Sequence, residues 1–415
     1  MRLRIRGPMR QLKLPILLGI LAACFVLLFQ TGVGRGQGNR PTSAATPTPR
    51  AWLQSPAIVS TAIAESYSAA SEIEIGPWEY PVGVNPLTGL AYPSDEAVSR
   101  RNLIVKISNW PPRVRPQHAI SLADLVYEYE AEGGVTRFAA LYRNYAPAQV
   151  GSVRSARLLD IELISMYAAL LAYSGTSRPI HDIYMNSNFR PLLLSPSLGD
   201  NCEQAGFCRD ATYSDRGYEH TLFGDTRQMW QLATRRNLNV GYRANGFAFG
   251  LQPNAGGTEV RDVYIKWYDR TDVRWQYDAS NRRYLRYADG ERHLDAIDDS
   301  QLVADNLVFI QVPHKRRPDL FARGAIDESY ELALWGRGPA YVLRDGLLFE
   351  GLWWRRSQNR GEALRLIFPD GDPILLKPGR TWVTITRSLD WAQISSELAD
   401  PSVTIASPQD LAATE

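Results

Sequence analysis

The sequence predicts an α+β protein in which a mixed α/β domain precedes a smaller, mainly antiparallel β domain. Three observations predict this fold. Alternating apolar residues mark strands before residue 150, an apolar segment after Ser155 has helical spacing, and turn-rich strand patterns fill the chain beyond residue 257. We therefore place the two domains at residues 81–255 and 262–400.

The first segment, residues 1–35, predicts a signal or membrane anchor. Five basic residues in the first 13 positions precede an uncharged apolar run over residues 14–29, which is the order found in signal and anchor segments. The run is near the lower limit for a spanning helix, so an uncleaved helix and a cleaved signal are both open. The stretch Leu-Ala-Ala-Cys ending at Cys24 also matches a lipobox, in which Cys24 would be lipidated. Each alternative puts the bulk of the chain on the extracytoplasmic face of the cell membrane.

Residues 36–80 predict a flexible tether, because a segment rich in Gly, Pro, Thr, Ser and Ala buries too little apolar surface to offset its ordering entropy. The whole chain has 46 basic and 44 acidic residues and a formal net charge of +2. Since no strong positive field is expected, we predict no nucleic-acid partner. We expect contact with the membrane through the N-terminal segment, and a cell-wall polymer or an envelope protein as a further partner.

The first domain begins with strands and continues with a helix. Residues 103–107 form a short apolar strand pattern, and residues 123–130 and 135–142 alternate on either side of two glycines, as in a β-hairpin. Ser155 is a natural N-cap for a helix over residues 156–173. This succession of strands and helix is the basis of the mixed α/β assignment.

Two cysteines lie in this domain. Cys202 and Cys208 have five residues between them, a spacing that suits a small disulfide loop in an oxidising compartment. A structural zinc needs four ligands, and the sequence has no second cysteine pair. A disulfide is therefore the prediction, and two free thiols are the alternative.

The second domain follows a turn-rich break at residues 253–257. Short apolar runs separated by Gly-containing turns predict antiparallel strands. Seven of the eleven tryptophans lie between Trp267 and Trp391. They either pack the core of a small sheet domain or line a surface on which sugars stack.

Several stretches of both domains are similar to segments of one bacterial family. They are residues 85–90, 101–109, 115–117, 123–128, 132–138 and 153–157 in the first domain, and residues 275–277, 284–286, 305–308, 351–353 and 378–382 in the second. In number and order they resemble the YerB-like lipoproteins, over about residues 83–388. The resemblance implies a two-domain fold and a membrane address but no mechanism, because the family has no established activity. The segment between Cys202 and Cys208 departs from the family, as does Glu-His-Thr-Leu-Phe at residues 219–223, where the family has a Pro-His-Asn-Leu-Tyr-like segment.

One group of charged residues predicts a ligand site. Arg154 and Arg157 lie at the predicted helix start, where backbone N–H groups already favour anions, and Arg137 lies on the second hairpin strand. We expect the three guanidinium groups to converge and to bind phosphate, pyrophosphate or carboxylate. Because like charges repel, we expect the acids Glu132 and Asp124 to lie near them.

The competing interpretation is that the arginines form internal ion pairs. Arg157 would then pair with Asp160 at helical spacing, and Arg137 with Glu128 or Glu130 across the hairpin. Both interpretations are open at the level of sequence.

The sequence has none of the common catalytic motifs, such as a nucleophile elbow, a Walker A loop or a zinc-protease helix. A looser similarity exists to the LytR-CpsA-Psr phosphotransferases, in the order of acid, hairpin and arginine. That similarity implies that Asp124 holds Mg²⁺ while the three arginines bind phosphates. No other cofactor is expected. Further catalytic candidates are His220, and His181 beside Asp182, because histidine next to an acid can perform acid–base chemistry.

The sequence thus predicts a membrane-anchored extracytoplasmic protein of the cell envelope. It would bind an anionic cell-wall or lipid-linked ligand, or a partner protein, through the arginines and acids of the first domain. The alternative is a metal-assisted phosphoryl-transfer or hydrolytic envelope enzyme. A metal site at Asp124 in the same pocket as the arginines would favour the enzyme.

Overall fold

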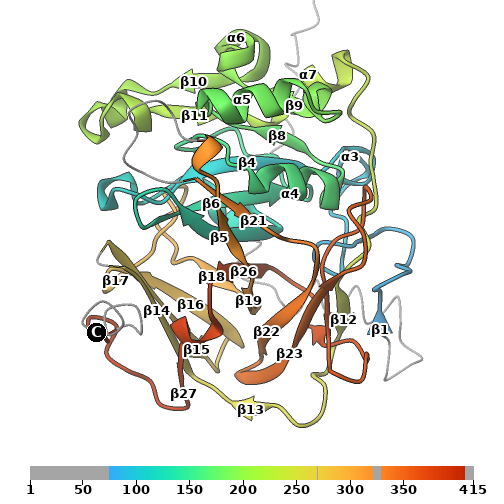
Figure 1. Cartoon of the computed structure of the whole chain (residues 1–415), viewed down its shortest axis with the longest axis vertical. Helices are drawn as coiled ribbons and strands as arrows, with labels where there is room; N and C mark the ends of the chain where they lie inside the picture. Colours follow the sequence, from blue (N-terminus) through green and yellow to red (C-terminus); the bar gives the residue numbers. More distant parts are fainter. Residues whose placement is uncertain (1–73, 269, 321–328, 407–415) are drawn as a thin grey trace, which may run out of the picture. The chain divides into compact units, whose positions relative to one another are not determined.

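The computed structural model describes residues 74–406, except residue 269 and residues 321–328 (Figure 1). The predicted anchor at residues 1–35, its Cys24 and residues 36–73 of the predicted tether lie outside these ranges. Across the residues that are described, no helix is both long and apolar enough to cross a membrane.

One mixed sheet dominates the structure, and within the described residues it has eleven strands. In spatial order they are β13 (Thr258–Glu259), β23 (Leu347–Arg355), β22 (Gly336–Arg344), β19 (Asn306–Gln311), β26 (Thr381–Thr386), β5 (Leu125–Ala131), β6 (Val135–Tyr142), β4 (Leu103–Ser108), β8 (Leu170–Ala172) and β9 (Leu193–Leu194), with β24 (Arg365–Ile367) beside β23. Strand β26 lies parallel to both β19 and β5. Strands from both sides of the predicted boundary at residues 255–262 therefore belong to the same sheet.

The predicted hairpin is confirmed as β5 and β6, which pair antiparallel from Leu125↔Leu141 to Ala131↔Val135. Gly133 and Gly134 form its turn with φ of 79° and 67°, values that residues with a Cβ rarely adopt. Every residue of both strands is buried, because the hairpin lies in the middle of the sheet.

The predicted helix over residues 156–173 is wrong in part. Helix α4 covers only Leu159–Tyr167, and β8 follows it. Ala168 ends the helix in the left-handed conformation, with φ of 46°, and β8 then pairs parallel with β4 and β9. Ser155 is not the N-cap, since Leu158 occupies that position without a side-chain cap.

The remaining α-helices of the described residues also lie before residue 236. They are α3 (Asp95–Ser99), α5 (Arg178–Met185), α6 (Cys202–Ala205) and α7 (Thr226–Arg235). The 3-10 turns are η1 (Pro112–Val114), η2 (Ile120–Leu122), η3 (Arg190–Leu192), η4 (Pro196–Leu198), η5 (Ala211–Arg216), η6 (Tyr218–His220), η7 (Pro318–Leu320) and η8 (Leu389–Trp391). In Figure 1, α5, α6 and α7 group beside β9 and the β10–β11 strands. The predicted disulfide is confirmed, because Cys202 and Cys208 are bonded to each other.

The second half of the chain is rich in strands, as predicted. Its own sheet consists of β17 (Glu291–Arg292), β16 (Arg283–Ala288), β15 (Thr271–Asp278), β14 (Asp262–Trp267) and β27 (Gln393–Ser395), with β18 (Val303–Ala304) beside β16. Its pairs are all antiparallel. Trp267, Trp275, Trp353 and Trp382 are fully buried, so these four tryptophans pack the core and offer no surface to sugars. The α+β class is confirmed.

Smaller sheets complete the fold. They are β1 (Glu74–Ile75), β12 (Ala248–Gly250) and β25 (Leu375–Leu376); β10 (Phe207–Arg209), β11 (Leu222–Gly224) and β7 (Val150–Gly151); β2 (Val84–Asn85) with β3 (Leu90–Ala91); and β20 (His314–Arg316) with β21 (Tyr330–Leu332). Because β1 pairs with β12 and Tyr80 is buried, the folded part extends into the predicted tether, at least to residue 74. A single apolar core cluster joins residues of both halves.

Candidate functional site

Three chain segments bring Arg137, Arg154 and Arg157 together. Arg137 lies on β6 opposite Ser108 of β4, and the backbone N–H of Arg154 donates to the Lys106 carbonyl of the same strand, at 2.9 Å. Arg157 lies just before α4. Burial, and then the positive charges of Arg157 and Arg154, lower the pKa of Arg137 to about 9. We call these three residues the arginine cluster.

Arg137 lies at the buried centre of the cluster, with 7% of its surface exposed. Its Nη1 donates to the carbonyl of the neighbouring Thr136 at 3.0 Å, and its Nε has no hydrogen-bond partner. Within the described ranges, no carboxylate lies within ion-pair distance of its guanidinium group. A buried cation without a counter-ion costs several kcal/mol, so this position favours an anion.

Arg154 and Arg157 differ in their partners. Arg154 donates from Nη1 to the Glu219 carbonyl at 3.1 Å, while its Nε is buried without a partner. Burial and then the charge of Arg157 lower its pKa. Arg157 forms an ion pair with Glu132, with 2.6 Å between Nε and Oε2. Among the described residues, the three guanidinium groups thus have one ion-paired carboxylate, Glu132, and a second acid, Glu219, that acts on Arg154 from farther away. The cluster keeps an excess of positive charge.

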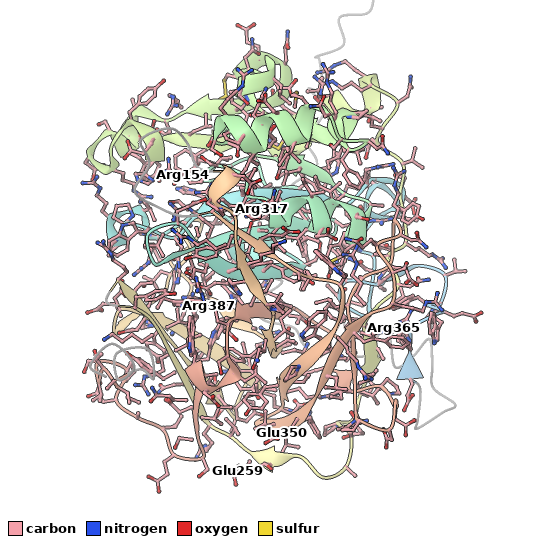
Figure 2. The ribbon with its side chains drawn as sticks, viewed as in Figure 1. Arg154, Glu259, Arg317, Glu350, Arg365 and Arg387 are labelled. Atoms are coloured by element: carbon pink, nitrogen blue, oxygen red, sulfur yellow. A yellow bond between two sulfur atoms is a disulfide. The ribbon has the colours of Figure 1, made fainter. Side chains whose placement is uncertain are left out.

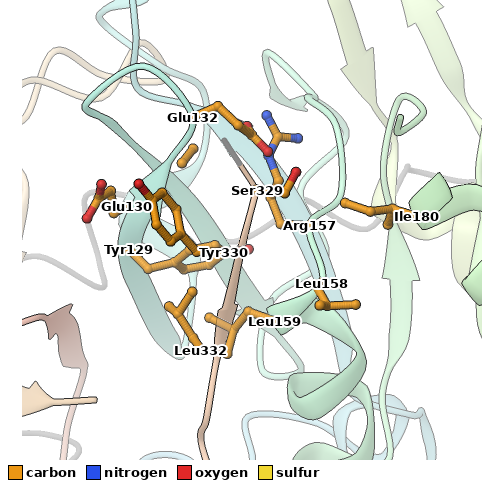
Figure 3. Close-up of a pocket in the computed structure, with 11 residues that line it drawn as sticks. Tyr129, Glu130, Glu132, Arg157, Leu158, Leu159, Ile180, Ser329, Tyr330 and Leu332 are labelled. Atoms are coloured by element: carbon orange, nitrogen blue, oxygen red, sulfur yellow. The ribbon is translucent and has the colours of Figure 1, made fainter. Parts of the chain in front are cut away.

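A small pocket lies beside the Arg157–Glu132 pair (Figure 3). In that view the two side chains point toward each other, and Tyr129 and Tyr330 lie next to Glu130. The pocket holds about 10 Å³, which is room for roughly one water molecule. This pocket is therefore too small for an anionic ligand larger than a water molecule.

His220 is the predicted catalytic candidate that the structure brings to the cluster. Only 2% of it is exposed. Burial, and then the charge of Arg154, lower its pKa to about 4, although Glu219 opposes this effect. Its Nδ1 lies 3.5 Å from Ser108 Oγ and its Nε2 lies 3.5 Å from a Glu219 carboxylate oxygen. The imidazole is therefore neutral at neutral pH, and it acquires a higher proton affinity when an anion offsets the arginines.

The other histidine candidate lies apart from the cluster. His181 and Asp182 are on α5, where Asp182 pairs with Arg178 one turn earlier, at 3.0 Å between Oδ1 and Nε. In the part of the chain that the structure describes, neither residue contacts the arginine cluster. The prediction of a site at this pair gains no geometric support.

Asp124 also lies apart, which corrects its predicted place in the site. It precedes β5, whereas Glu132 follows that strand, and eight residues of extended chain span about 26 Å. Asp124 Oδ2 accepts the backbone N–H groups of Arg143, at 2.6 Å, and Asn144, at 3.0 Å. Burial raises its pKa to about 6 despite these bonds. It organises the loop after β6 instead of facing the arginines.

Among the described residues, Asp124 has no neighbouring side chains that could complete a metal site. Among the residues with described positions, no three His, Cys, Asp or Glu side chains form a group that could hold a metal ion. The oxygen atoms of Asp124 are used by backbone donors and by Asn85. The residues present do not fit the Mg²⁺ that the looser phosphotransferase similarity implies.

The predicted internal ion pairs do not form. Glu128 pairs with Arg286 at 2.7 Å, and Glu130 pairs with Arg387 at 2.8 Å. Asp160 pairs with the buried Lys106, at 3.0 Å.

Asp160 contacts Arg157 only through the backbone. One of its carboxylate oxygens accepts the Arg157 backbone N–H, at 2.7 Å. Neither Arg137 nor the Arg157 guanidinium group has the partner that helix or hairpin spacing suggested.

Sequence reasoning missed other residues around the cluster. Ser108 and Arg113 come from β4 and from the turn after it, and Glu219 precedes His220. Arg113 and Glu219 meet at Gly217, where atoms of both lie within 3.6 Å of the ideal Cβ position. The adjacency of Glu219 to His220 was a usable sequence signal, whereas Arg113 had none.

Comparisons with known proteins give the family. Residues 87–240 match the model of the "Protein of unknown function (DUF3048) N-terminal domain", and residues 263–383 match that of the C-terminal domain. The chain belongs to the DUF3048 family. The "Putative lipoprotein YerB" of Bacillus subtilis (strain 168) is 26% identical over 316 residues, which are 75% of this chain and 88% of that protein. The resemblance predicted from the sequence is confirmed.

A solved structure shows the same fold. The crystal structure of the YerB protein from Bacillus subtilis matches with a TM-score of 0.63 and 23% identity, over 75% of this chain and 99% of that chain. The arginine cluster and His220 all lie within the DUF3048 N-terminal domain of this protein.

Proposed function

We propose that this protein is held at the extracytoplasmic face of the cell membrane by its N-terminal segment and binds an anionic ligand through Arg137, Arg154 and Arg157. The location at the membrane is supported by the basic and apolar segment at residues 1–35 and by the similarity to the "Putative lipoprotein YerB" of Bacillus subtilis. The ligand is an anionic group of a cell-wall or lipid-linked molecule.

The observation that supports anion binding best is the environment of Arg137. The chain buries this guanidinium group beside two others, and no carboxylate of the described residues lies within ion-pair distance of it, although Glu132 acts on it from farther away. Buried charges in proteins are normally paired, so the missing partner is best supplied by a ligand. A phosphate group matches the donor geometry of guanidinium groups and would accept hydrogen bonds from more than one arginine.

A titration of the full-length protein in detergent tests this proposal. We expect inorganic phosphate and pyrophosphate to bind, with affinities that fall as ionic strength rises. Arg154→Gln should weaken binding about tenfold or more, because a charge-assisted hydrogen bond contributes about 1.5–3 kcal/mol. The matched control is Arg178→Gln, which removes an exposed arginine of α5. Equal anion affinity in wild type and Arg154→Gln would contradict the proposal.

A further inference from the structure

The turn next to the arginine cluster presents an aromatic ring to solvent. Tyr218, the first residue of η6, is 73% exposed. The guanidinium carbon of Arg209 lies 3.5 Å from the centre of its ring. Arg209 also donates to the Tyr218 carbonyl and, at 3.0 Å, to the hydroxyl of Thr221. The ring is therefore held on a fixed turn with one side supported by Arg209.

This turn is connected directly to the cluster. Arg154 donates to the carbonyl of Glu219, the residue after Tyr218. The charges of Arg154, Arg137 and Arg113 all act on His220, the last residue of the same turn. An anion bound at Arg154 would therefore lie next to the turn that carries Tyr218 and Glu219.

Glu219 distinguishes this site from a simple phosphate site. Its side chain is 53% exposed, and its carboxylate lies 3.5 Å from Nε2 of His220, whose ring is neutral at neutral pH. A carboxylate beside the cluster weakens the binding of bare phosphate, because the two charges repel. The same carboxylate accepts hydrogen bonds from hydroxyl groups. Glu219 is thus suited to a ligand that has hydroxyl groups next to its phosphate.

We infer that the ligand is a glycosyl phosphate, with its phosphate at Arg137, Arg154 and Arg157, its sugar ring against Tyr218 and a hydroxyl group on Glu219. This inference rests on the proposed function and deepens it. A tyrosine ring offers an apolar face to the C–H groups of a sugar, and polar groups at its edge bind the hydroxyls. Arg113 Nη2 and Glu219 Oε2 lie 3.6 Å and 3.3 Å from the ideal Cβ position of Gly217, so Arg113 can supply donors near that edge.

A second exposed aromatic residue provides a matched control. Trp78 is 49% exposed, and Arg365 lies 3.4 Å from the centre of its ring. Arg365 pairs with Glu362, and Figure 2 shows that Arg365 and Arg154 lie in separate parts of the molecule. Trp78 therefore reproduces the stack of aromatic ring and arginine without the arginine cluster.

The test is a calorimetric titration of the full-length protein in detergent with four probes: inorganic phosphate, glucose 1-phosphate, glucose and uridine monophosphate. We expect glucose 1-phosphate to bind about tenfold more tightly than inorganic phosphate, a ratio that corresponds to about 1.4 kcal/mol. Tyr218→Ala should remove this gain and leave the phosphate affinity unchanged. Glu219→Gln should weaken glucose 1-phosphate but not phosphate, and Trp78→Ala should change neither.

Each alternative result of this titration contradicts a defined part of the inference or of the proposed function. If phosphate and glucose 1-phosphate bind equally well, or if Tyr218→Ala leaves their ratio unchanged, the sugar site is wrong while the proposed anion site stands. If uridine monophosphate binds best and depends on Tyr218, the ring stacks a base and the glycosyl assignment is wrong. If no phosphate-containing probe binds, the proposed function itself fails.

Discussion

Arg286 in the second half of the chain and Arg137 in the first are both buried, yet their surroundings differ. Arg286 forms an ion pair with Glu128 at 2.7 Å, and its guanidinium carbon lies 4.9 Å from the ring centre of Trp382. Arg137 has a backbone carbonyl and two other arginines. Arg143 is also buried without an ion pair among the described residues, but its guanidinium group donates to three backbone carbonyls and to the side chain of Asn102. Within those residues Arg137 has a single hydrogen bond and an unpartnered Nε, and this difference supports the proposed ligand site.

The largest expected change in the free energy of unfolding comes from replacing Arg286, the arginine that is paired with Glu128. Arg286→Met should lower the free energy of unfolding by about 3–5 kcal/mol, because it leaves the Glu128 carboxylate buried without its cation. Urea unfolding followed by tryptophan fluorescence measures this loss. The double variant with Glu128→Gln should recover part of it. A loss below about 1 kcal/mol would contradict the assignment of Arg286 as a structural residue.

The pH dependence of stability tests whether burial and the nearby arginines lower the pKa of His220. Its pKa is about 4 in the folded protein and about 6.5 in an unfolded chain. As pH falls below about 6.5 the unfolded state binds the proton first, so stability decreases until the folded pKa is reached. Between pH 7 and 4.5, wild type should lose about 2 kcal/mol more than His220→Gln. Identical pH profiles of the two proteins would exclude a neutral His220 beside the arginines.

A smaller effect of opposite sign is expected at Arg137. Without anions, Arg137→Met should leave the free energy of unfolding unchanged or raise it by about 1 kcal/mol, because it removes a buried charge that has no partner. Phosphate should stabilise wild type against unfolding but not the variant. Thermal unfolding with and without phosphate measures both effects. If Arg137→Met loses as much stability as Arg286→Met, Arg137 stabilises the fold as Arg286 does, and the contrast between a structural and a ligand-binding arginine is wrong.

The smallest effect is expected on the surface of α5. Arg178→Ala breaks an ion pair with Asp182 in which both side chains are largely exposed. Such pairs contribute about 0.3–0.5 kcal/mol. Urea unfolding at low and high salt should show a difference of this size that disappears at high salt. A loss of several kcal/mol on replacing Arg178 would show that an exposed arginine can stabilise the fold as much as the buried Arg286, which would contradict this comparison.

Local patterns predicted local structure well. Alternation around Gly133 and Gly134 sufficed for the β5–β6 hairpin, because strand periodicity and turn residues act over short distances. The apolar run over residues 156–173 led to the wrong prediction of one continuous helix. A buried strand such as β8 and a buried helix have the same apolar composition. The sheet shared by both halves could not be predicted, since it depends on pairing between Thr381 and Leu125.

The site was predictable only in part. Hairpin periodicity placed Arg137 on the second strand, but the helix-start argument for Arg154 and Arg157 was wrong, because α4 begins at Leu159. Asp124 was misplaced because it directly precedes β5, whereas Glu132 directly follows that strand. Glu128 pairs with Arg286, which is 158 residues away in the sequence. No rule based on residue spacing predicts a contact over that separation.

The pairing of β26 with β5 also sets an order of events for the nascent chain. While ribosomes are still producing the second half, β5 has β6 on one side and an unpaired row of backbone groups on the other, because residues 381–386 do not yet exist. An unpaired strand edge is a template for association between chains, and contacts this distant in sequence form slowly. A messenger truncated before residue 381 would therefore yield a product that aggregates, and the intact chain requires protection of that edge until its last strands arrive.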